Sequence, residues 1–272
     1  MRKYIAVTVF GEFMKSFNVM FRVLLTAYGF IRFAIHVLWL SKWVIPKIMN
    51  SNDKTMIAKR QAALWQAHRH VASYLSILSR LGLISFKFIG KPIEEPALIV
   101  ANHPSLIDFI VLLKDFPNAV CLFKQQTKKN PILADFVKVA GYVEGMDGTR
   151  ESCERIISDC CQRLDEGHHV AVFPEGTRSA SNLSVGRFRT TVFYAALKAQ
   201  VPIQPVSIYC APLFLGKKQA WIDFSRQRNI MVIEYLEPIT IKDFSHEGVT
   251  PQAIAEESRQ KIVSNLISSS EH

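Results

Sequence analysis

Two short apolar runs, each ending abruptly in a polar block, constrain the fold of this chain most strongly. Residues 98–101 are followed at once by the polar block 102–108, and residues 170–173 are followed by the polar block 174–179. A short apolar run bounded by turn residues is typical of a buried strand. In α/β sheets, functional groups collect beyond the ends of such strands. We therefore expect both polar blocks to lie at strand ends and to carry the function.

The rest of the chain after residue 97 alternates strand-like with helix-like segments. Further strands are predicted at 203–209 and 231–235, and helices at 131–139, 150–165, 188–199 and 251–268. Strands that alternate with helices indicate an α/β class. We therefore predict that residues 91–272 form an α/β domain with a central mixed sheet flanked by helices, entered through the proline-containing linker 91–96.

The N-terminal segment 1–90 differs from this domain, because residues 4–49 are mostly apolar. A helix that spans a bilayer needs about 20 apolar residues with few charges, and Arg32 and His36 interrupt the most apolar window. We therefore expect a hydrophobic helical segment that associates with the membrane by lying in one leaflet or dipping into it, while its basic side chains reach the headgroups. A strained single span and a buried helix hairpin are the alternatives.

The charge distribution separates the same two regions. Residues 1–95 contain 14 Lys and Arg against 4 Asp and Glu, whereas residues 96–272 contain 19 of each, so the whole net charge of +10 lies in the N-terminal third. A basic surplus fits nucleic acid or an anionic membrane. Because these basic residues are spread through hydrophobic sequence and no zinc-finger or RRM signature follows, we expect a membrane lipid surface as the partner and no nucleic acid.

The cysteines indicate the compartment. There are five of them, with no CxxC pair, so neither a disulfide framework nor a zinc site is expected and a reducing compartment is the simpler setting. Together with the basic apolar segment, this predicts a protein associated with the cytoplasmic face of a membrane, the inner membrane if the protein is bacterial.

The two polar blocks resemble the signature motifs of a known enzyme family. The pattern NHx4D at 102–108 and the pattern FPEGTRS at 173–179 are similar to those of the glycerolipid acyltransferases. The most similar group by pattern is the bacterial type that acylates 1-acylglycerol 3-phosphate. Residues 201–206 resemble the final block of that family, and Lys124 stands where its second block carries a lysine. The resemblance covers roughly residues 95–210, with the blocks in the same order.

His103 and Asp108 are the residues that the resemblance implies for catalysis. Acyl transfer from a thioester to an alcohol needs a base that takes the hydroxyl proton near pH 7, and imidazole is suited to this task. Asp108 would accept a hydrogen bond from the other ring nitrogen and fix the tautomer. The spacing also matches a capping box, in which Asp108 only reaches back to the N–H of Ser105. The carboxylate could serve both purposes.

The turn after the strand at 170–173 has residue types that bind an anion. Arg178 offers a planar guanidinium fork for a phosphate, and Gly176 lets the backbone approach closely. The resemblance implies that Glu175, Gly176, Thr177 and Arg178 bind the substrate. Lys124 is a further substrate-binding candidate. A surface turn with a solvated arginine is the alternative.

Two positions differ from the family pattern. Where the second block usually ends in arginine, this chain has Met146, and Arg150 or Arg155 could supply the missing charge. Where the family often has Phe-Lys-x-Gly after its third block, this chain has FRTT at 188–191. Both differences concern the acceptor and not the base, so they leave the reaction type unchanged and the identity of the acceptor open.

The sequence therefore predicts a membrane-associated O-acyltransferase. It would transfer a fatty acyl group from acyl-ACP or acyl-CoA to the hydroxyl of a lysophospholipid, with lysophosphatidic acid as the default acceptor. A lyso-aminolipid, a glycolipid or a polyene lipid as acceptor is the first alternative. A catalytically silent membrane-binding module and a thioester hydrolase are the others. No metal and no cofactor are expected, beyond the acyl carrier protein or CoA thioester that serves as the donor substrate.

Overall fold

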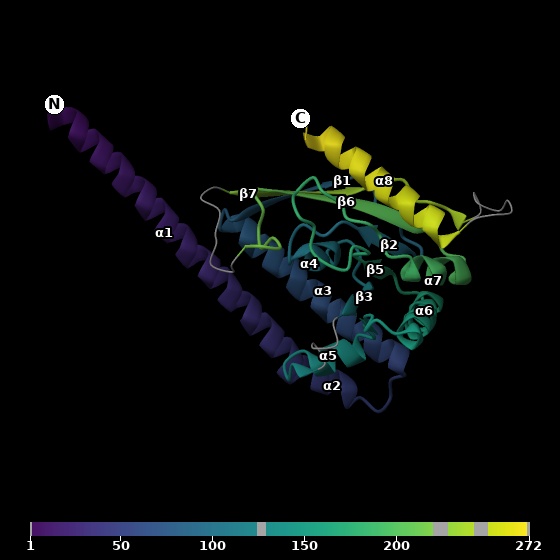
Figure 1. The fold of residues 1–272 in the computed structure, drawn as a ribbon. Helices are drawn as coiled ribbons and strands as arrows, with labels where there is room; N and C mark the ends of the chain where they lie inside the picture. The colour runs from purple at the N-terminus through teal and green to yellow at the C-terminus, as the bar shows by residue number, and fades with distance from the viewer. Residues whose placement is uncertain (1, 124–128, 220–227, 242–249, 271–272) are drawn as a thin grey trace.

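A mixed sheet lies at the centre of the molecule (Figure 1). The computed structural model describes residues 2–123, 129–219, 228–241 and 250–270, and their side chains between residues 20 and 268. The strands in this part of the chain are β1 (Ile84–Ile89), β2 (Leu98–Ala101), β3 (Val120–Phe123), β4 (Val143–Glu144), β5 (Val170–Val172), β6 (Ile203–Ala211) and β7 (Asn229–Tyr235). Their order in the sheet is β1-β7-β6-β2-β5-β3-β4, and neighbouring strands are parallel except β6 and β7.

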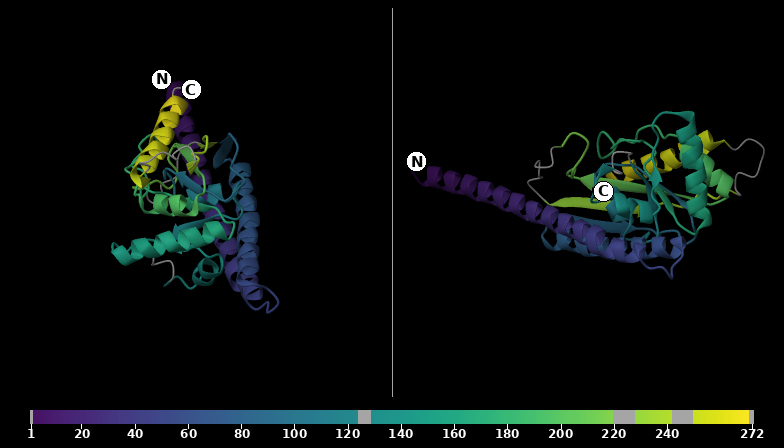
Figure 2. Two further views of the ribbon diagram at one scale, coloured as in Figure 1. Left: turned by 90° about the vertical axis from the view of Figure 1, so that its right-hand side faces the viewer. Right: turned by 90° about the horizontal axis from the view of Figure 1, so that it is seen from below.

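Helices cover both faces of this sheet (Figure 2). In chain order they are α1 (Arg2–Trp39), α2 (Ile45–Met49), α3 (Met56–Arg80), α4 (Asp108–Leu112), α5 (Ala134–Val139), α6 (Arg150–Asp165), α7 (Thr191–Ala199) and α8 (Pro251–Ser270). Helices α6, α7 and α8 pack against one face, and α4 and the C-terminal half of α3 pack against the other. The predicted α/β class, with a mixed sheet flanked by helices, is thereby confirmed.

Strand β2 shows how the core is divided into two layers. All of its residues are fully buried. Because successive side chains of a strand point to opposite faces, Leu98 and Val100 join the layer of α6, α7 and α8, whereas Ile99 and Ala101 join the layer of α3 and α4. A strand buried on both faces reads as a continuous apolar run, which is why the sequence predicted this one.

The sequence predicted the long elements and missed three strands. Strand β1 pairs with β7 and lies before residue 91, so the sheet begins within the segment 1–90 and not at the predicted start of the domain. Strand β1 lies at the edge of the sheet and is only partly buried. Strands β3 and β4 are short and join the opposite end. Short or half-exposed strands give a weaker sequence signal than the buried centre of a sheet.

The apolar N-terminal residues form one long helical rod. Helix α1 continues through a π-helical turn, η1 (Leu40–Val44), into α2 without a reversal of the chain. The alternative of a buried hairpin within residues 4–49 is therefore wrong. The stretch Met20–Met49 is long and apolar enough to cross a membrane, with a mean hydropathy of 1.7, and most of it is not buried inside the protein. It is a candidate membrane segment.

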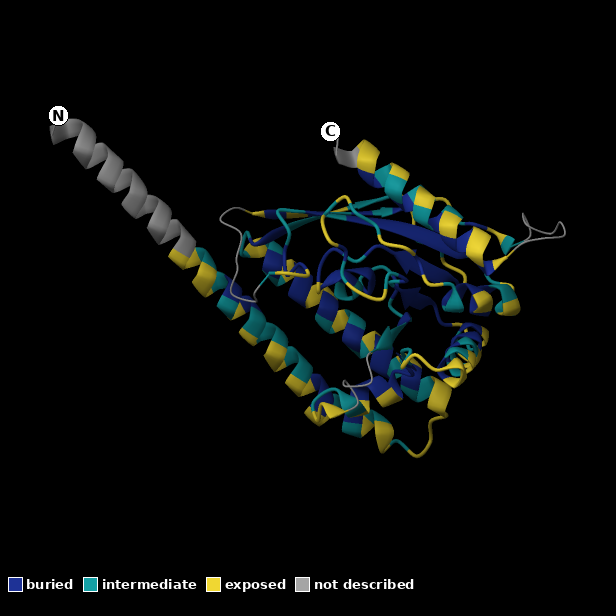
Figure 3. Cartoon of the chain, in the orientation of Figure 1, coloured by how far each residue is buried: buried dark blue, intermediate teal, exposed yellow. Residues whose placement is uncertain are grey.

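The two faces of α1 have different surroundings. One face packs against α3: the rings of Phe33 and Tyr74 lie 5.0 Å apart, and a Cβ at Gly29 would lie 3.3 Å from a methyl group of Leu78. The other face carries exposed apolar side chains at helical spacing (Figure 3). This outer apolar stripe comprises Phe21, Leu24, Tyr28, Ile31, Ile35 and Leu38.

A buried ion pair fixes α3 to the α/β layers. The Arg60 guanidinium pairs with the Glu166 carboxylate at the end of α6, and Arg163 pairs with the same carboxylate at 2.8 Å. Gly141 has a φ of +70°, and a Cβ at this position would overlap the Arg60 side chain. Glycine at 141 therefore leaves room for the arginine that holds α3, and with it α1, against the body of the protein.

We expect Arg60→Met to lower the free energy of unfolding by about 1–3 kcal/mol, because it leaves a mostly buried carboxylate with only one of its cationic partners. Arg150→Met is the matched control, since the Arg150–Glu154 pair is exposed and should contribute about 0–1 kcal/mol. Urea unfolding of both variants in the same detergent measures the difference. Equal loss of stability in the two variants would contradict a special role for the buried pair.

Candidate active site

The two polar blocks lie side by side because their strands are neighbours. Strands β2 and β5 are parallel, with Val100 opposite Val172, so the chain leaves both strands at the same edge of the sheet. His103 and Phe173 stand just beyond these strand ends. Their rings are stacked, with centroids 4.2 Å apart. The structure thus brings together the two motifs that the sequence singled out.

Asn102 fixes the beginning of the first block to the neighbouring strand β6. Its buried side chain donates from Nδ2 to the Ile208 carbonyl at 2.8 Å and accepts from the Ile208 N–H at 2.7 Å. The side-chain amide thereby continues the pairing between strands where the main chain turns away. Sequence reasoning gave Asn102 no role, although an amide directly after a buried strand is a signal for such a bridge.

His103 and Asp108 make the contact that the sequence predicted. His103 Nδ1 lies 2.8 Å from Asp108 Oδ2, and the same oxygen accepts from the Ser105 N–H at 2.8 Å. The carboxylate therefore makes both contacts that the sequence left as alternatives. Asp108 is the first residue of α4 and is fully buried, whereas the His103 side chain is 20% exposed. A carboxylate at Nδ1 favours the tautomer that leaves a lone pair on Nε2.

Glu175 connects the two blocks through its half-buried carboxylate. Its Oε1 accepts from the His103 N–H at 3.1 Å and from the Ser179 hydroxyl at 2.6 Å, and its Oε2 accepts from the Gly186 N–H at 2.8 Å. The Ser179 N–H donates in return to the His103 carbonyl at 2.7 Å. Both carboxylate oxygens are thus engaged within the protein. Glu175 therefore positions His103. The sequence had predicted only that Glu175 contacts the substrate.

Gly176 and Thr177 form the exposed tip of the second block. Gly176 has a φ of +70°, in the left-handed region that favours glycine. A Cβ at this position would lie 2.8 Å from the guanidinium of Arg189. The turn therefore favours glycine for its backbone conformation, and the Arg189 side chain packs closely over it.

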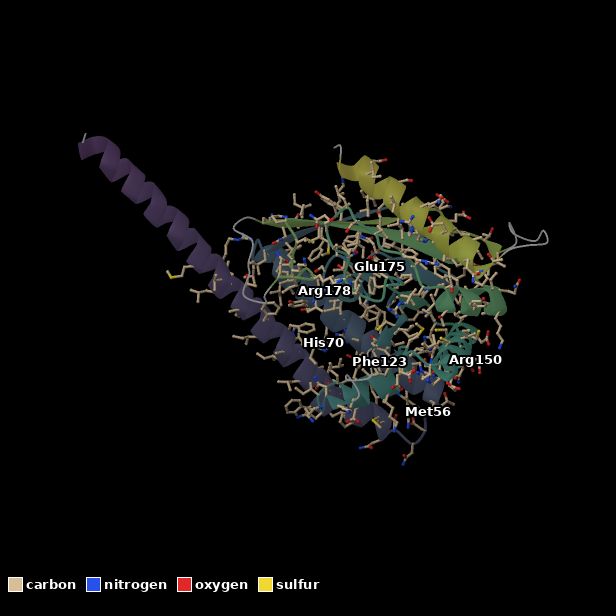
Figure 4. The ribbon with its side chains drawn as sticks, in the orientation of Figure 1. Met56, His70, Phe123, Arg150, Glu175 and Arg178 are labelled. Atoms are coloured by element: carbon tan, nitrogen blue, oxygen red, sulfur yellow. The ribbon has the colours of Figure 1, made fainter. Side chains whose placement is uncertain are left out.

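Arg178 connects the second block to the loop that follows β6. Its Nη1 donates to the carbonyls of Leu215 at 2.6 Å and Gly216 at 2.9 Å. The Ser105 hydroxyl donates to the Phe214 carbonyl at 2.6 Å, so the same loop is also tied to the first block. Glu175 and Arg178 are labelled in Figure 4. One terminal nitrogen of Arg178 therefore holds this loop. The sequence had predicted only that the guanidinium binds a phosphate, and did not predict this contact within the protein.

The groups expected from the second block of the family are placed differently. Lys124 lies outside the described residues. Met146 is partly buried against the core and brings no charge. Arg155 donates to two backbone carbonyls next to β4, and Arg150 pairs with a glutamate on the surface of α6, so these contacts do not support either as a substitute for the missing arginine. Within the described ranges, no three His, Cys, Asp or Glu side chains are grouped to hold a metal ion.

The surroundings of Asp108 change its acidity. Burial raises the pKa of its carboxyl to about 6, against the lowering effect of the hydrogen bond with His103. Its other oxygen, Oδ1, is buried and has no hydrogen-bond partner in the described part of the chain. Burying the charged carboxylate therefore costs free energy. In this buried site, its hydrogen bond with His103 is stronger than the same hydrogen bond in water.

An apolar cavity adjoins the helix that carries Asp108. It has a volume of about 260 Å³ and lies between α1, α3, α4 and α5. We call it the inter-helix cavity, and its apolar lining includes Phe33, Val71, Phe109, Ile110 and Phe136. Phe109 directly follows Asp108 in α4, so one short helix contributes to both the cavity and the catalytic candidate pair.

The sequence is similar to those of known acyltransferases. Residues 85–209 match the family model for acyltransferases. These residues form an acyltransferase domain. The chain is 26% identical over 217 residues to the 1-acyl-sn-glycerol-3-phosphate acyltransferase of Saccharomyces cerevisiae, with 78% of this chain and 69% of that protein aligned. It is 32% identical over 130 residues to the lyso-ornithine lipid O-acyltransferase of Rhodobacter capsulatus, spanning 45% of each protein.

The fold of this chain is also found in a solved structure. The crystal structure of the 1-acyl-sn-glycerophosphate acyltransferase from Thermotoga maritima superimposes with a TM-score of 0.72 at 21% identity, covering 92% of this chain and 96% of that one. This coverage extends the shared fold beyond the acyltransferase domain into the N-terminal helices. The resemblance to glycerolipid acyltransferases predicted from the two motifs is confirmed.

We expect the stability of Asp108→Asn relative to the wild type to increase with pH. The pKa of Asp108 is raised from 3.8 to about 6 in the folded protein. Protonated Asp108 therefore contributes fully to the free energy of unfolding of the wild type below pH 3.8, and this contribution is lost as the pH rises through 6. Asparagine does not titrate, and the difference in unfolding free energy should therefore shift in its favour by up to about 3 kcal/mol. Denaturant unfolding at pH 4, 6 and 8 measures this shift. A difference that does not change with pH would contradict a raised pKa.

Proposed function

We propose that this acyltransferase transfers a fatty acyl group from acyl-ACP or acyl-CoA to the hydroxyl of a lysophospholipid, with lysophosphatidic acid as the default acceptor. The observation that carries the proposal is the contact of His103 Nδ1 with the buried carboxylate of Asp108. It leaves Nε2, on a partly exposed ring, as the base. The acceptor supplies the nucleophile, so no nucleophilic side chain is needed in the protein.

The proposed reaction moves one proton through His103. Nε2 takes the proton from the acceptor hydroxyl while the hydroxyl oxygen attacks the thioester carbonyl, and Asp108 stabilises the imidazolium that forms. The tetrahedral intermediate then loses the thiolate, which receives the proton from Nε2. An ester and a free thiol are the products. Glu175 supports both steps because it fixes the backbone of His103.

The acceptor headgroup is proposed to lie beside the turn of Gly176, Thr177 and Arg178. Gly176 and Thr177 are exposed, and the Arg178 guanidinium has donors besides the Nη1 that holds the loop after β6. A second acceptor class is favoured by a specific observation: Met146 replaces the arginine usual in the family and is packed against the core. The similarity to a lyso-ornithine lipid O-acyltransferase supports a phosphate-free lyso-aminolipid as that second candidate.

The donor chain is proposed to enter the inter-helix cavity. A soluble carrier delivers the acyl group from water, so its chain needs an apolar environment in the protein during transfer. The acceptor can leave its own chain in the bilayer. The inter-helix cavity offers such an environment next to α4, the helix that begins with Asp108.

The membrane surface is proposed to meet the outer apolar stripe of α1. The stripe is exposed along the helix, and the candidate membrane segment contains it. The excess of basic residues in 1–95 adds electrostatic attraction to anionic lipids, and these lipids are enriched in the cytoplasmic leaflet. We therefore propose an enzyme bound to the cytoplasmic face of its membrane.

We expect His103→Ala to reduce turnover by roughly 10²–10⁴ without unfolding the protein, the range for loss of a general base. Release of free thiol from acyl-CoA and acyl-ACP is followed with lysophosphatidate, with a lyso-aminolipid and without acceptor, and the lipid product is identified by mass spectrometry. Release that requires an acceptor distinguishes a transferase from a hydrolase. Normal turnover by a folded His103→Ala variant would contradict the proposed mechanism. Absence of turnover by the wild type with every acceptor would favour a silent membrane-binding module.

We expect the combined substitution of Leu24, Ile31 and Ile35 by glutamate to weaken binding to anionic vesicles at least about tenfold, because each side chain contributes about 1.5–3 kcal/mol when buried in an apolar phase. Ile267→Glu, at an exposed position of α8, is the matched control and should bind like the wild type. Vesicle sedimentation measures both. Substitution is preferred to deletion of residues 1–50, since deletion would also uncover the face of α3 that α1 covers. Unchanged sedimentation of the triple variant would exclude the stripe as the membrane contact.

A further inference from the structure

An exposed arginine lies over the tip of the second polar block. Arg189 stands shortly before α7, and its side chain approaches the turn of Gly176. A Cβ at Gly176 would lie 2.8 Å from Arg189 Cζ, 3.0 Å from Nε and 3.1 Å from Nη2. The guanidinium is planar, and its central carbon is nearer to this position than either nitrogen is. The flat face of the guanidinium, and not its edge, therefore lies against the glycine.

This placement leaves the donors of Arg189 unused. Guanidinium N–H groups lie in the plane of the group, so a guanidinium with its face on the turn directs them sideways and not into the turn. Within the described part of the chain, the Arg189 side chain makes no hydrogen bond and no ion pair. Arg178, the arginine within the block, uses its Nη1 to hold the loop after β6. The whole donor fork of Arg189 is therefore open to a ligand.

The main chain also fixes Arg189 to the second block. The Arg189 N–H donates to the Pro174 carbonyl at 3.0 Å, and the Gly186 N–H donates to Glu175 Oε2 at 2.8 Å. Between these two contacts, Phe188 is buried in the core. Binding costs less conformational entropy when the binding group is already held in place. The backbone of Arg189 has therefore lost its freedom before a ligand arrives.

The charges around this turn favour an anion. Both carboxylate oxygens of Glu175, the acidic residue of the turn, accept hydrogen bonds within the protein. Met146 brings no charge, and its Sδ lies 3.5 Å from Thr191 Oγ1, so it contacts the segment 189–191. Position 146 therefore lacks the expected cation, but Arg189 stands two residues before the side chain that Met146 touches.

We propose that Arg189 binds the phosphate monoester of the acceptor through the edge of its guanidinium, and thereby replaces the arginine that position 146 lacks. This inference rests on the proposed function, because it assigns the acceptor headgroup to the turn of Gly176. Two parallel N–H donors match two phosphate oxygens, and such charge-assisted hydrogen bonds are roughly twice as strong as neutral ones. A phosphate-free acceptor gains nothing from this fork, so Arg189 favours acceptors that carry a phosphate.

The first experiment measures the two substrates separately. Lysophosphatidate is presented in detergent micelles, together with whichever acyl donor the wild type uses. Arg189→Met should raise the KM for lysophosphatidate roughly 10- to 100-fold, the range for loss of a hydrogen bond to a charged group. The KM for the donor and the melting temperature should stay nearly unchanged. Arg189→Lys should recover only part of the loss, because a point charge cannot reproduce a planar fork.

Arg187→Met is the matched control. Arg187 is exposed on the same segment but lies toward α8: the pKa of Glu256 is lowered mainly by its hydrogen bond with Arg259, and the charge of Arg187 lowers it further. Arg187→Met should leave the KM for lysophosphatidate nearly unchanged. An equal rise in both arginine variants would overturn the proposal, since it would show only a general effect of charge. An unchanged KM in Arg189→Met, or an equal rise for donor and acceptor, would overturn it as well.

A binding measurement separates this inference from the proposed function. Short-chain lysophosphatidate, the matching monoacylglycerol and inorganic phosphate are titrated calorimetrically without donor. The wild type should bind lysophosphatidate most tightly, and Arg189→Met should remove most of its advantage over monoacylglycerol. Inorganic phosphate that binds as tightly as the lysolipid would overturn the assignment to the acceptor. Acyl transfer to lysophosphatidate that does not depend on Arg189 would overturn the inference alone, whereas Arg189-dependent binding without acyl transfer to any acceptor would overturn the proposed function and keep the phosphate site.

Discussion

The buried carboxylate of Asp108 is the interaction on which the site depends. One of its oxygens accepts from both the Ser105 N–H and His103 Nδ1, so it closes the turn and orients the imidazole at the same time. Burial makes this position costly, as the raised pKa shows. The cost is sustained by the packing of α4 against the sheet, since Val111 and Leu112 are fully buried directly behind the pair. The orientation of the His103 imidazole therefore depends on the packing of the hydrophobic core around α4.

A set of polar cross-links extends this order from one motif to the other. The amide of Asn102 holds β6, and Glu175 accepts from the backbone of His103. Arg178 and Ser105 both donate to the loop after β6. Several motif residues thus position the imidazole or its surroundings. Substitutions at these sites are therefore expected to displace His103, even where the altered side chain does not touch a substrate.

The N-terminal helices carry an apolar surface on each of two sides. One face of α1 is the exposed apolar stripe, and its other face, with α3, α4 and α5, encloses the inter-helix cavity. The ion pair of Arg60 with Glu166 keeps α3 in a fixed relation to the sheet. The outer apolar stripe and the inter-helix cavity are thereby separated by the thickness of a single helix. Under the proposed function, one helix would contact both the bilayer and the donor chain.

The sequence by itself determined the fold class and the buried strand β2, because these depend on local patterns such as a continuous apolar run. The contact of His103 with Asp108 was predicted from the resemblance of the motifs, with the capping contact to Ser105 left open. It could not determine that β1 extends the sheet, or that Glu175 accepts from the backbone of His103, because those contacts join residues far apart in the chain. It left open whether the apolar N-terminal segment reverses. Only the tertiary structure decided that the segment continues as one helix. The same packing of α3 against α1 decided which face of α1 is buried.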